Sequence, residues 1–307
     1  MTLTKFLDPK NDVAFKKIFG TEKNKDILIQ FLNDVIDFKG KQPIKNVTFL
    51  KNELDPETQA HKVSLVDIMC EDQSGNRYIV EMQVCRQKGF EKRAQYYAAK
   101  AYTSQAKKNG EYHDLKEVIF LAVADFDMFP KKKGYKSDHV ILDKETLEND
   151  LKDFSFTFLE LRKMKKKIDQ LSNRLEKWVY FFLHAEDTKE KDLAKIVGSD
   201  EIIERAYEEL DRFSWDDKDL MKYENAEKRE ADHQAILSQK LDEGIAIGRA
   251  EGLVEGEAKG HAKGLVEGEE KGKIDIIRRL LAKYPPEFVA EMTGLTLQQI
   301  EQFLVPE

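Results

Sequence analysis

The spacing of apolar residues predicts a mixed α/β segment followed by a mainly helical one. Apolar residues recur at helical intervals near the start, and a later alanine-rich stretch contains no proline. Helices are therefore expected at 12–19, 24–37 and 89–109. Shorter apolar runs predict strands at 44–54, 116–126, 138–143 and 154–161. The run at 116–126, KEVIFLAVADF, is almost unbroken, which is typical of a central strand buried on both faces.

Residues 63–85, VSLVDIMCEDQSGNRYIVEMQVC, contain two apolar runs around a polar turn, a pattern that predicts a β-hairpin. Asp67 interrupts the first run, and Glu81 and Gln83 interrupt the second. Burying a carboxylate is costly unless it is paired or binds a metal. The hairpin is therefore the candidate functional site.

The length of the hairpin loop decides whether Asp67 and Glu81 meet. Side chains alternate across a strand, so a register shift of one residue moves a side chain to the other face. A two- or four-residue loop sets Asp67 on the wrong face. A five-residue loop at 72–76 pairs Glu71 with Arg77 and sets Asp67 opposite Glu81. A site built from both carboxylates therefore requires an odd-length loop or a bulge.

The order helix, strand, hairpin, helix, strand predicts an α/β fold with a mixed β-sheet flanked by helices. Beyond about residue 165 the chain changes character and becomes helical. Four helices are expected at 171–185, 189–197, 199–213 and 217–243. The aromatic residues of the first of these, such as Trp178 and Phe182, should pack against the sheet.

Residues 244–273 carry a glycine at every fourth position, from Gly244 to Gly272. Each glycine costs a helix about 1 kcal/mol relative to alanine, although pairs such as Glu255–Lys259 give modest support. One interpretation is a solvated, semi-flexible helical linker, and the other is close helix packing in a homo-oligomer. Residues 274–307 then resemble a helix-turn-helix in size, but the second helix lacks the cations that DNA reading requires, which favours a packing or oligomerisation cap.

Composition narrows the class of protein further. The chain has 307 residues, a net charge of −7 and two cysteines, which fits one large or two modest domains in a reducing compartment. We see no signal peptide and no run of about 18 apolar residues, so we expect a cytoplasmic protein without a membrane span. Lysine clusters at 131–133 and 163–167 either hold a DNA backbone or form solvated surface.

If Asp67 and Glu81 meet, two like charges lie at one point between the strands, and a cation between them relieves the repulsion. Carboxylate and carbonyl oxygens suit Mg²⁺ or Mn²⁺. Such an ion activates water and stabilises the charge that develops on a phosphodiester. The amide of Gln83 can orient the water or contact a phosphate, but it cannot be a general base. The alternative is that these acids lie on an exposed strand, where such residues are common.

Four motifs follow one another along nearly the whole chain. They are DVAFKKIFG at 12–20, VDIMCEDQSGNRYIVEMQ at 66–83, RAQYYAAKAYTSQ at 93–105, and the glycine-periodic tail that ends in EMTGLTLQQIEQFL. This ordered set resembles the recombination-promoting nuclease, or transposase, family of the PD-(D/E)XK nuclease superfamily. The resemblance implies a restriction-endonuclease-like core and a metal-dependent DNA endonuclease linked to recombination and mobile elements.

The resemblance also implies roles for particular residues. Asp67 and Glu81 are expected to be metal ligands, with the backbone carbonyl of Met82 as a third. The superfamily usually has lysine where Gln83 stands, so a cation that stabilises charge is missing at that position. Because the helix after the hairpin lines the cleft in related nucleases, Arg93 is a candidate for the missing charge. The other interpretation is an exposed arginine beside a packed tyrosine.

Asp12 opens the first helix, where related folds often carry an extra acid, and it is equally a plain helix cap or first-turn acid. The expected organisation is a nuclease-like core at 1–165, a helical region at 166–243 packed on or extending from it, the tail at 244–273, and the C-terminal element at 274–307. The predicted function is a Mg²⁺- or Mn²⁺-dependent DNA endonuclease. The alternative is a non-catalytic DNA-binding or self-assembling protein with a degenerate nuclease core.

Overall fold

The structure is a computed structural model that describes residues 4–38, 40, 42–54, 64–106 and 110–303. The chain divides into two compact units, the first ending at Glu230 and the second starting at Ala231. The predicted boundary near residue 165 therefore falls inside the first unit, which holds both the sheet and the helices that follow it. The predicted four-part division of the chain stays a prediction.

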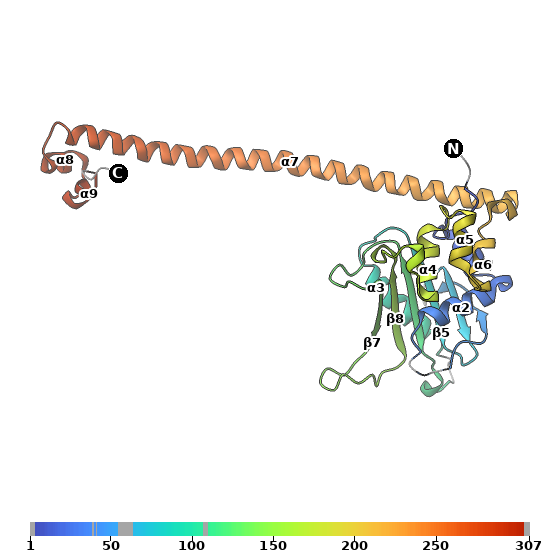
Figure 1. The fold of residues 1–307 in the computed structure, drawn as a ribbon. Helices are drawn as coiled ribbons and strands as arrows, with labels where there is room; N and C mark the ends of the chain where they lie inside the picture. Colours follow the sequence, from blue (N-terminus) through green and yellow to red (C-terminus); the bar gives the residue numbers. More distant parts are fainter. Residues whose placement is uncertain (1–3, 39, 41, 55–63, 107–109, 304–307) are drawn as a thin grey trace. The chain divides into compact units, whose positions relative to one another are not determined.

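A six-stranded mixed sheet forms the centre of the first unit (Figure 1). Its strands lie in the order β1-β4-β5-β6-β8-β7. Their bounds are β1 Val47–Phe49, β4 Ile68–Asp72, β5 Arg77–Gln83, β6 Val118–Ala124, β7 Lys136–Val140 and β8 Phe154–Glu160. Strands β5, β6 and β8 are parallel, and the other neighbours pair antiparallel. The short strands β2 (Glu53–Leu54) and β3 (Ser64–Leu65) form a separate pair, so the expected strand at 44–54 is two strands.

Helices cover both faces of this sheet, which confirms the predicted α/β fold class. Their bounds are α1 Asp12–Phe19, α2 Lys25–Val35, α3 Phe90–Thr103, α4 Arg174–His184, α5 Glu190–Val197 and α6 Glu201–Glu208. Apolar side chains of α3 pack with alternate sheet residues such as Ile79 and Phe120. Residues of the other five helices, including Trp178 and Phe182, pack with the opposite set, such as Val80. All seven residues of β6 are buried, as expected of a strand covered on both faces.

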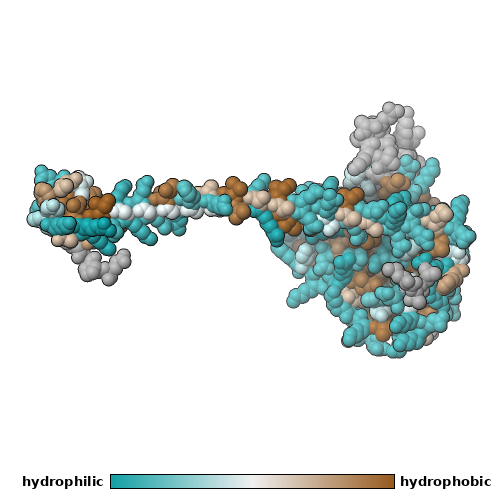
Figure 2. Space-filling view, turned by 90° about the horizontal axis from the view of Figure 1, so that it is seen from above, coloured by the Kyte–Doolittle hydropathy of each residue, from teal (hydrophilic) through white to brown (hydrophobic). Residues whose placement is uncertain are grey.

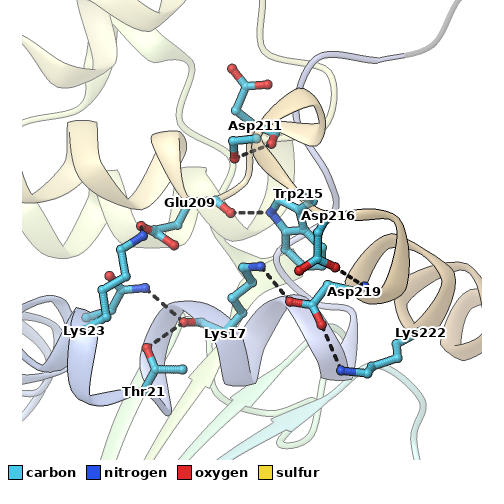
Figure 3. Close-up of polar contacts among 11 residues, drawn as sticks. Lys17, Thr21, Lys23, Glu209, Asp211, Trp215, Asp216, Asp219 and Lys222 are labelled. Carbon is cyan, nitrogen blue, oxygen red and sulfur yellow. Dashed lines mark hydrogen bonds and ion pairs between the residues drawn. The ribbon is translucent and has the colours of Figure 1, made fainter.

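Beyond α6, the chain folds back against the first helix of the protein (Figure 3). The Trp215 indole N–H donates to the backbone carbonyl of Glu209 at 2.8 Å, which fixes the turn before the next helix. The Nζ atom of Lys17 on α1 lies 3.0 Å from Asp219 Oδ2 and 4.2 Å from the Trp215 ring centroid. These contacts secure the start of α7, and the Tyr223 hydroxyl accepts the backbone N–H of Asp8 one turn later.

Helix α7 runs from Asp217 to Leu281 and includes the eight periodic glycines, so the helix expected at 217–243 and the helical segment expected at 244–273 are one continuous helix. Two short helices, α8 (Pro286–Thr293) and α9 (Leu297–Glu301), follow it. They enclose a small core with the end of α7, in which Ile277, Val289 and Ile300 are buried. Among the described residues, no helix is both long enough and apolar enough to cross a membrane.

Candidate active site

The hairpin has the register that brings the two carboxylates together. Glu71 pairs with Arg77, so the loop is the five-residue turn at 72–76. Asp72 holds this turn, because its Oδ1 accepts the N–H groups of Ser74 at 2.7 Å and Asn76 at 3.0 Å. Counting back along the ladder from these pairs sets Asp67 opposite Glu81, on the register that the two-carboxylate site requires.

Asp67 lies at a break in the first hairpin strand. The chain leaves the ladder between β3 and β4, and the buried Val66 donates its N–H to the Asn52 carbonyl at 2.9 Å. Asp67 therefore turns toward β5, where its Oδ2 accepts the N–H of Met82 at 2.9 Å. Its own N–H donates to Glu81 Oε1 at 3.3 Å. The expected straight strand is thus interrupted where its acidic residue stands.

Glu81 connects this point to helix α3 through a row of hydrogen bonds. Its side chain is buried, with 3% of its surface exposed. Its Oε2 accepts from Gln83 Nε2 at 3.0 Å, and Gln83 Oε1 accepts from Arg93 Nη2 at 2.7 Å. The amide of Gln83 therefore joins the carboxylate to a guanidinium. Arg93 itself lies over the rings of Phe90 and Tyr97, at 4.9 and 5.9 Å from their centroids. The structure thus brings Arg93 to the hairpin instead of leaving it at the surface alone.

A second cation approaches from the opposite side. Lys16 on α1 lies with its Nζ 3.7 Å from Asp67 Oδ1 and 2.6 Å from Asp12 Oδ1. Asp12 is the first residue of α1, while the cap is Asn11, whose side chain accepts the N–H of Val13. Asp12 therefore reaches the site through Lys16, and it makes no direct hydrogen bond to Asp67 or Glu81 among the described contacts.

Burial and the neighbouring charge raise the pKa values of both hairpin carboxylates. Burial raises the pKa of Asp67, and the Met82 N–H and the Lys16 ammonium only partly offset this. Burial, together with the neighbouring charge of Asp67, raises the pKa of Glu81 to about 8. Like charges held close in a poorly solvated place disfavour double ionisation. A cation placed beside both oxygens would reverse that effect, as metal ions do in such sites.

The backbone of Met82 points toward the same place. Gln83 turns its carbonyl toward β6, where it accepts the N–H of Asp125 at 2.9 Å. Backbone groups alternate in direction along a strand, so those of Met82 point toward β4, and its N–H meets Asp67 there. Its carbonyl therefore faces the side on which Asp67 stands, as a third ligand at this site requires.

These groups fit a hard divalent ion. Two carboxylates and a carbonyl are oxygen donors of the kind that Mg²⁺ and Mn²⁺ prefer, with water completing the shell. Within the described part of the chain, no three His, Cys, Asp or Glu side chains lie together as a possible metal site. The two carboxylates alone supply too few protein ligands for a divalent ion, so the Met82 carbonyl is needed as a third. The ligand roles of Asp67, Glu81 and Met82 stay predictions.

Sequence reasoning did not single out Lys16. Its spacing from Asp12, four residues along a helix, is the signal that places both on one face. It also missed a group at the end of β6, where Asp125 binds Arg162 at 3.1 Å and lies 3.6 Å from Lys10. Asp125 directly follows the residue that pairs with Gln83, so this group lies at the same edge of the sheet.

Comparison with known proteins identifies the family of the chain. The family model described as PD-(D/E)XK nuclease family transposase matches residues 9–240. No curated protein and no solved structure matches the chain. The family match covers well over half of the sequence and includes the whole sheet, the hairpin and the helices on both faces. The chain therefore belongs to the PD-(D/E)XK nuclease family transposases.

Proposed function

We propose that the protein is a Mg²⁺- or Mn²⁺-dependent endonuclease that hydrolyses phosphodiester bonds in DNA. The observation that carries the proposal is the meeting of Asp67 and Glu81 at the strand break, joined by a hydrogen bond of 3.3 Å. Holding two ionised carboxylates together with little water around them costs free energy, and a divalent cation between them offsets that cost. Membership of a nuclease family supports the reaction class.

Each polar residue of the site has a separate task in this reaction. Asp67, Glu81 and the Met82 carbonyl would hold the ion, which would supply a Lewis acid and an activated water. Gln83 keeps the Glu81 carboxylate oriented through its 3.0 Å hydrogen bond. As an amide, Gln83 takes no proton from water, so the proton leaves through the solvent or a phosphate oxygen.

Arg93 supplies the positive charge that the superfamily usually places at the position of Gln83. Its guanidinium keeps charge at any working pH and can bind two phosphate oxygens at once. The Nε atom of Arg93 is buried and has no hydrogen-bond partner among the described residues. Because this atom is buried, a phosphate reaches Arg93 only through its two Nη groups, which bond Gln87 and Gln83. Lys16, with 40% of its side chain exposed, provides a second charge on the other side of Asp67.

Plasmid nicking by the purified chain tests the proposal. Supercoiled plasmid is incubated with Mg²⁺, Mn²⁺ or a chelator, and the wild type is compared with Asp67→Ala and Glu81→Ala. Glu71→Gln is the matched control, because Glu71 is a carboxylate of the same hairpin that pairs with Arg77. Circular dichroism verifies that every variant is folded.

We expect cutting that needs the metal, that is lost in both site variants, and that persists in Glu71→Gln. Cutting by a folded Asp67→Ala variant at the wild-type rate would refute the site assignment. If the folded wild type cuts no DNA in either Mg²⁺ or Mn²⁺, catalysis is refuted and the non-catalytic DNA-binding alternative remains.

A further inference from the structure

A group of exposed cations lies beyond the ends of two central strands. An open hollow of about 580 Å³ after β6 and β8 is lined by five cations and one carboxylate, that of Asp127. An adjoining hollow of about 500 Å³ is lined by four cations and no carboxylate. The two share Arg162 and Lys165. We call their exposed cations the basic surface, which comprises Lys132, Lys133, Arg162, Lys165, Lys166 and Lys167.

Most of this charge is not neutralised by the protein. Arg162 binds Asp125, and Lys166 binds Glu176 at 2.5 Å. The other four lysines have no carboxylate within ion-pair distance in the part of the chain that the structure describes. In a chain with a net charge of −7, such a local excess of positive charge is unusual. Unpaired cations gathered on one face attract a polyanion and concentrate it locally.

Buried contacts fix the two loops that carry these lysines to one another. Glu160, at the end of β8, is fully buried, and its Oε1 accepts the N–H groups of Met128 and Phe129 in the loop after β6. Lys163 closes the arrangement, with its Nζ 2.8 Å from Glu160 Oε1 and 2.8 Å from the Phe129 carbonyl. The basic surface is therefore held in place before any ligand arrives, which lowers the ordering cost of binding.

The sheet sets the position of this surface relative to the carboxylates. Gln83 on β5, Ala124 on β6 and Glu160 on β8 are aligned in the parallel ladder. Neighbouring strands lie about 4.8 Å apart, so Glu160 lies about 10 Å from Gln83. Arg162 follows two residues later at the same carboxyl edge. The candidate metal site and the basic surface therefore share one edge of the sheet.

We infer that the basic surface binds the phosphate backbone of duplex DNA and guides it to the carboxylates of Asp67 and Glu81. This inference rests on the proposed function, because that function makes DNA the polyanion in question. Duplex DNA carries a charge for about every 1.7 Å of its axis, so a track of cations at this edge meets several phosphates. Lysines bind phosphates as point charges without reading bases, so the surface positions DNA without specifying its sequence.

Equilibrium binding of the full chain to DNA tests this inference without cleavage. The full chain is titrated into a fluorescein-labelled duplex of about 30 base pairs, with chelator present to prevent cleavage. Fluorescence anisotropy gives the Kd at several salt concentrations. The test variant is Lys165→Ala with Lys167→Ala. The matched control is Lys144→Ala with Lys152→Ala, two exposed lysines on the β7–β8 connection at the opposite, amino edge of β8. Both variants lose the same charge, so a difference between them reports position.

We expect the test variant to bind about tenfold more weakly at low salt, and its salt slope to fall by about two, one for each lost phosphate contact. The control should bind like the wild type. Equal binding by both variants, or no binding of DNA by the wild type, overturns the inference. An RNA duplex that binds more tightly through the same two lysines overturns the choice of DNA.

The outcome separates this inference from the proposed function. If the wild type fails to nick plasmid yet its DNA binding depends on Lys165 and Lys167, the basic surface stands and catalysis falls. If the wild type nicks DNA and the two lysines do not affect binding, the proposed function stands and the basic surface falls.

Discussion

Asp67 donates its backbone N–H to the Glu81 carboxylate at 3.3 Å, so the two acids of the hairpin are joined directly across the strands. This relationship needs both the five-residue turn and the break between β3 and β4. The turn sets the register, and the break frees the Asp67 backbone to turn toward β5. A continuous strand would use the same N–H in its own ladder.

The first prediction concerns the pH dependence of stability without metal. The pKa of Glu81 is raised from 4.5 to about 8 by burial and by Asp67. Between these two pH values the folded state keeps a proton that the unfolded state has released, so folding stability falls as pH rises through this window. In chelator, the melting temperature of the wild type should therefore decrease from pH 5 to pH 8.5.

Glu81→Gln should remove much of this decrease, because a neutral amide has no proton to lose. Glu71→Gln serves as the control and should keep it. Addition of Mg²⁺ should raise the melting temperature of the wild type more at pH 8.5 than at pH 5.5, because protons compete with the metal. Differential scanning fluorimetry measures the melting temperatures of the wild type and both variants across this pH range, with and without Mg²⁺. A wild-type profile that is flat, or that rises with pH, would contradict the raised pKa.

The second prediction concerns Lys16. Its ammonium lies 3.7 Å from Asp67, so Lys16→Met should slow cleavage by about tenfold or more, through lost stabilisation of charge in the transition state. Metal affinity should not fall, because a cation beside the ligands opposes metal binding. Lys16→Arg should restore part of the rate. Lys25→Met is the control, since Lys25, the first residue of α2, pairs with Glu22 just before that helix. Cleavage rates and metal titrations at fixed pH separate the two effects.

Local sequence chemistry was sufficient to predict where the hairpin turns and that β6 is buried on both faces. The turn at 72–76 depends on contacts within five residues, namely the hydrogen bonds of Asp72 and the positive φ of 86° at Gly75. The sequence marked the position of this turn but left the loop length open, and the structure has the five-residue loop that pairs Glu71 with Arg77. The burial of β6 on both faces likewise follows from its own unbroken apolar run.

Contacts between distant segments were not predictable in this way. Lys16 and Asp67 are 51 positions apart in sequence, and nothing local marks the pair. The break before β4 was also not predicted. The apolar run at 63–71 predicts one continuous strand, and the hydrogen bond from Val66 to Asn52 that accompanies the break involves a distant residue. Helix α7 continues through the periodic glycines to Leu281, which both interpretations of this segment, a helical linker and a packed helix, allow. For the Lys16–Asp67 pair and for the break before β4, the deciding partner lies far along the chain.

The third prediction concerns the hydrogen bond between Gln83 and Arg93. Gln83→Lys restores the residue type usual in the superfamily, but it sets an ammonium where the amide oxygen accepts from Arg93 at 2.7 Å. The variant should therefore melt at a lower temperature, because two cations meet in a partly buried place. Adding Arg93→Gln should recover part of the loss.

A double-mutant cycle measures this interaction. We expect a favourable coupling of about 1 kcal/mol or more between the two substitutions, because the residues are in direct contact. Additive effects of the two substitutions on unfolding would show that the side chains at positions 83 and 93 do not interact in solution. The double variant also reports function, since the lysine at position 83 then takes over the charge that Arg93 supplied.

The fourth prediction concerns the periodic glycines of α7. A Cβ atom built on Gly256, Gly260 or Gly264 meets no other atom within 4 Å, and none of these positions has positive φ. Alanine there should favour the helix by about 1 kcal/mol per site. The side chains along this stretch include the exposed pairs Leu253–Val254 and Leu265–Val266. Figure 2 shows apolar groups between hydrophilic ones along the long helix.

The triple variant Gly256→Ala, Gly260→Ala, Gly264→Ala distinguishes the two interpretations of this tail. If the segment is a solvated helix, helicity measured by circular dichroism rises and the mass measured by light scattering stays unchanged. If the glycines allow helices of two chains to approach closely, added methyl groups hold them apart and the oligomer weakens. The matched control is Ala246→Gly with Ala258→Gly, which should lower helicity because it removes methyl groups from the same helix. A decrease in mass for the alanine variant alone would favour the oligomer, since greater helicity by itself cannot separate the chains.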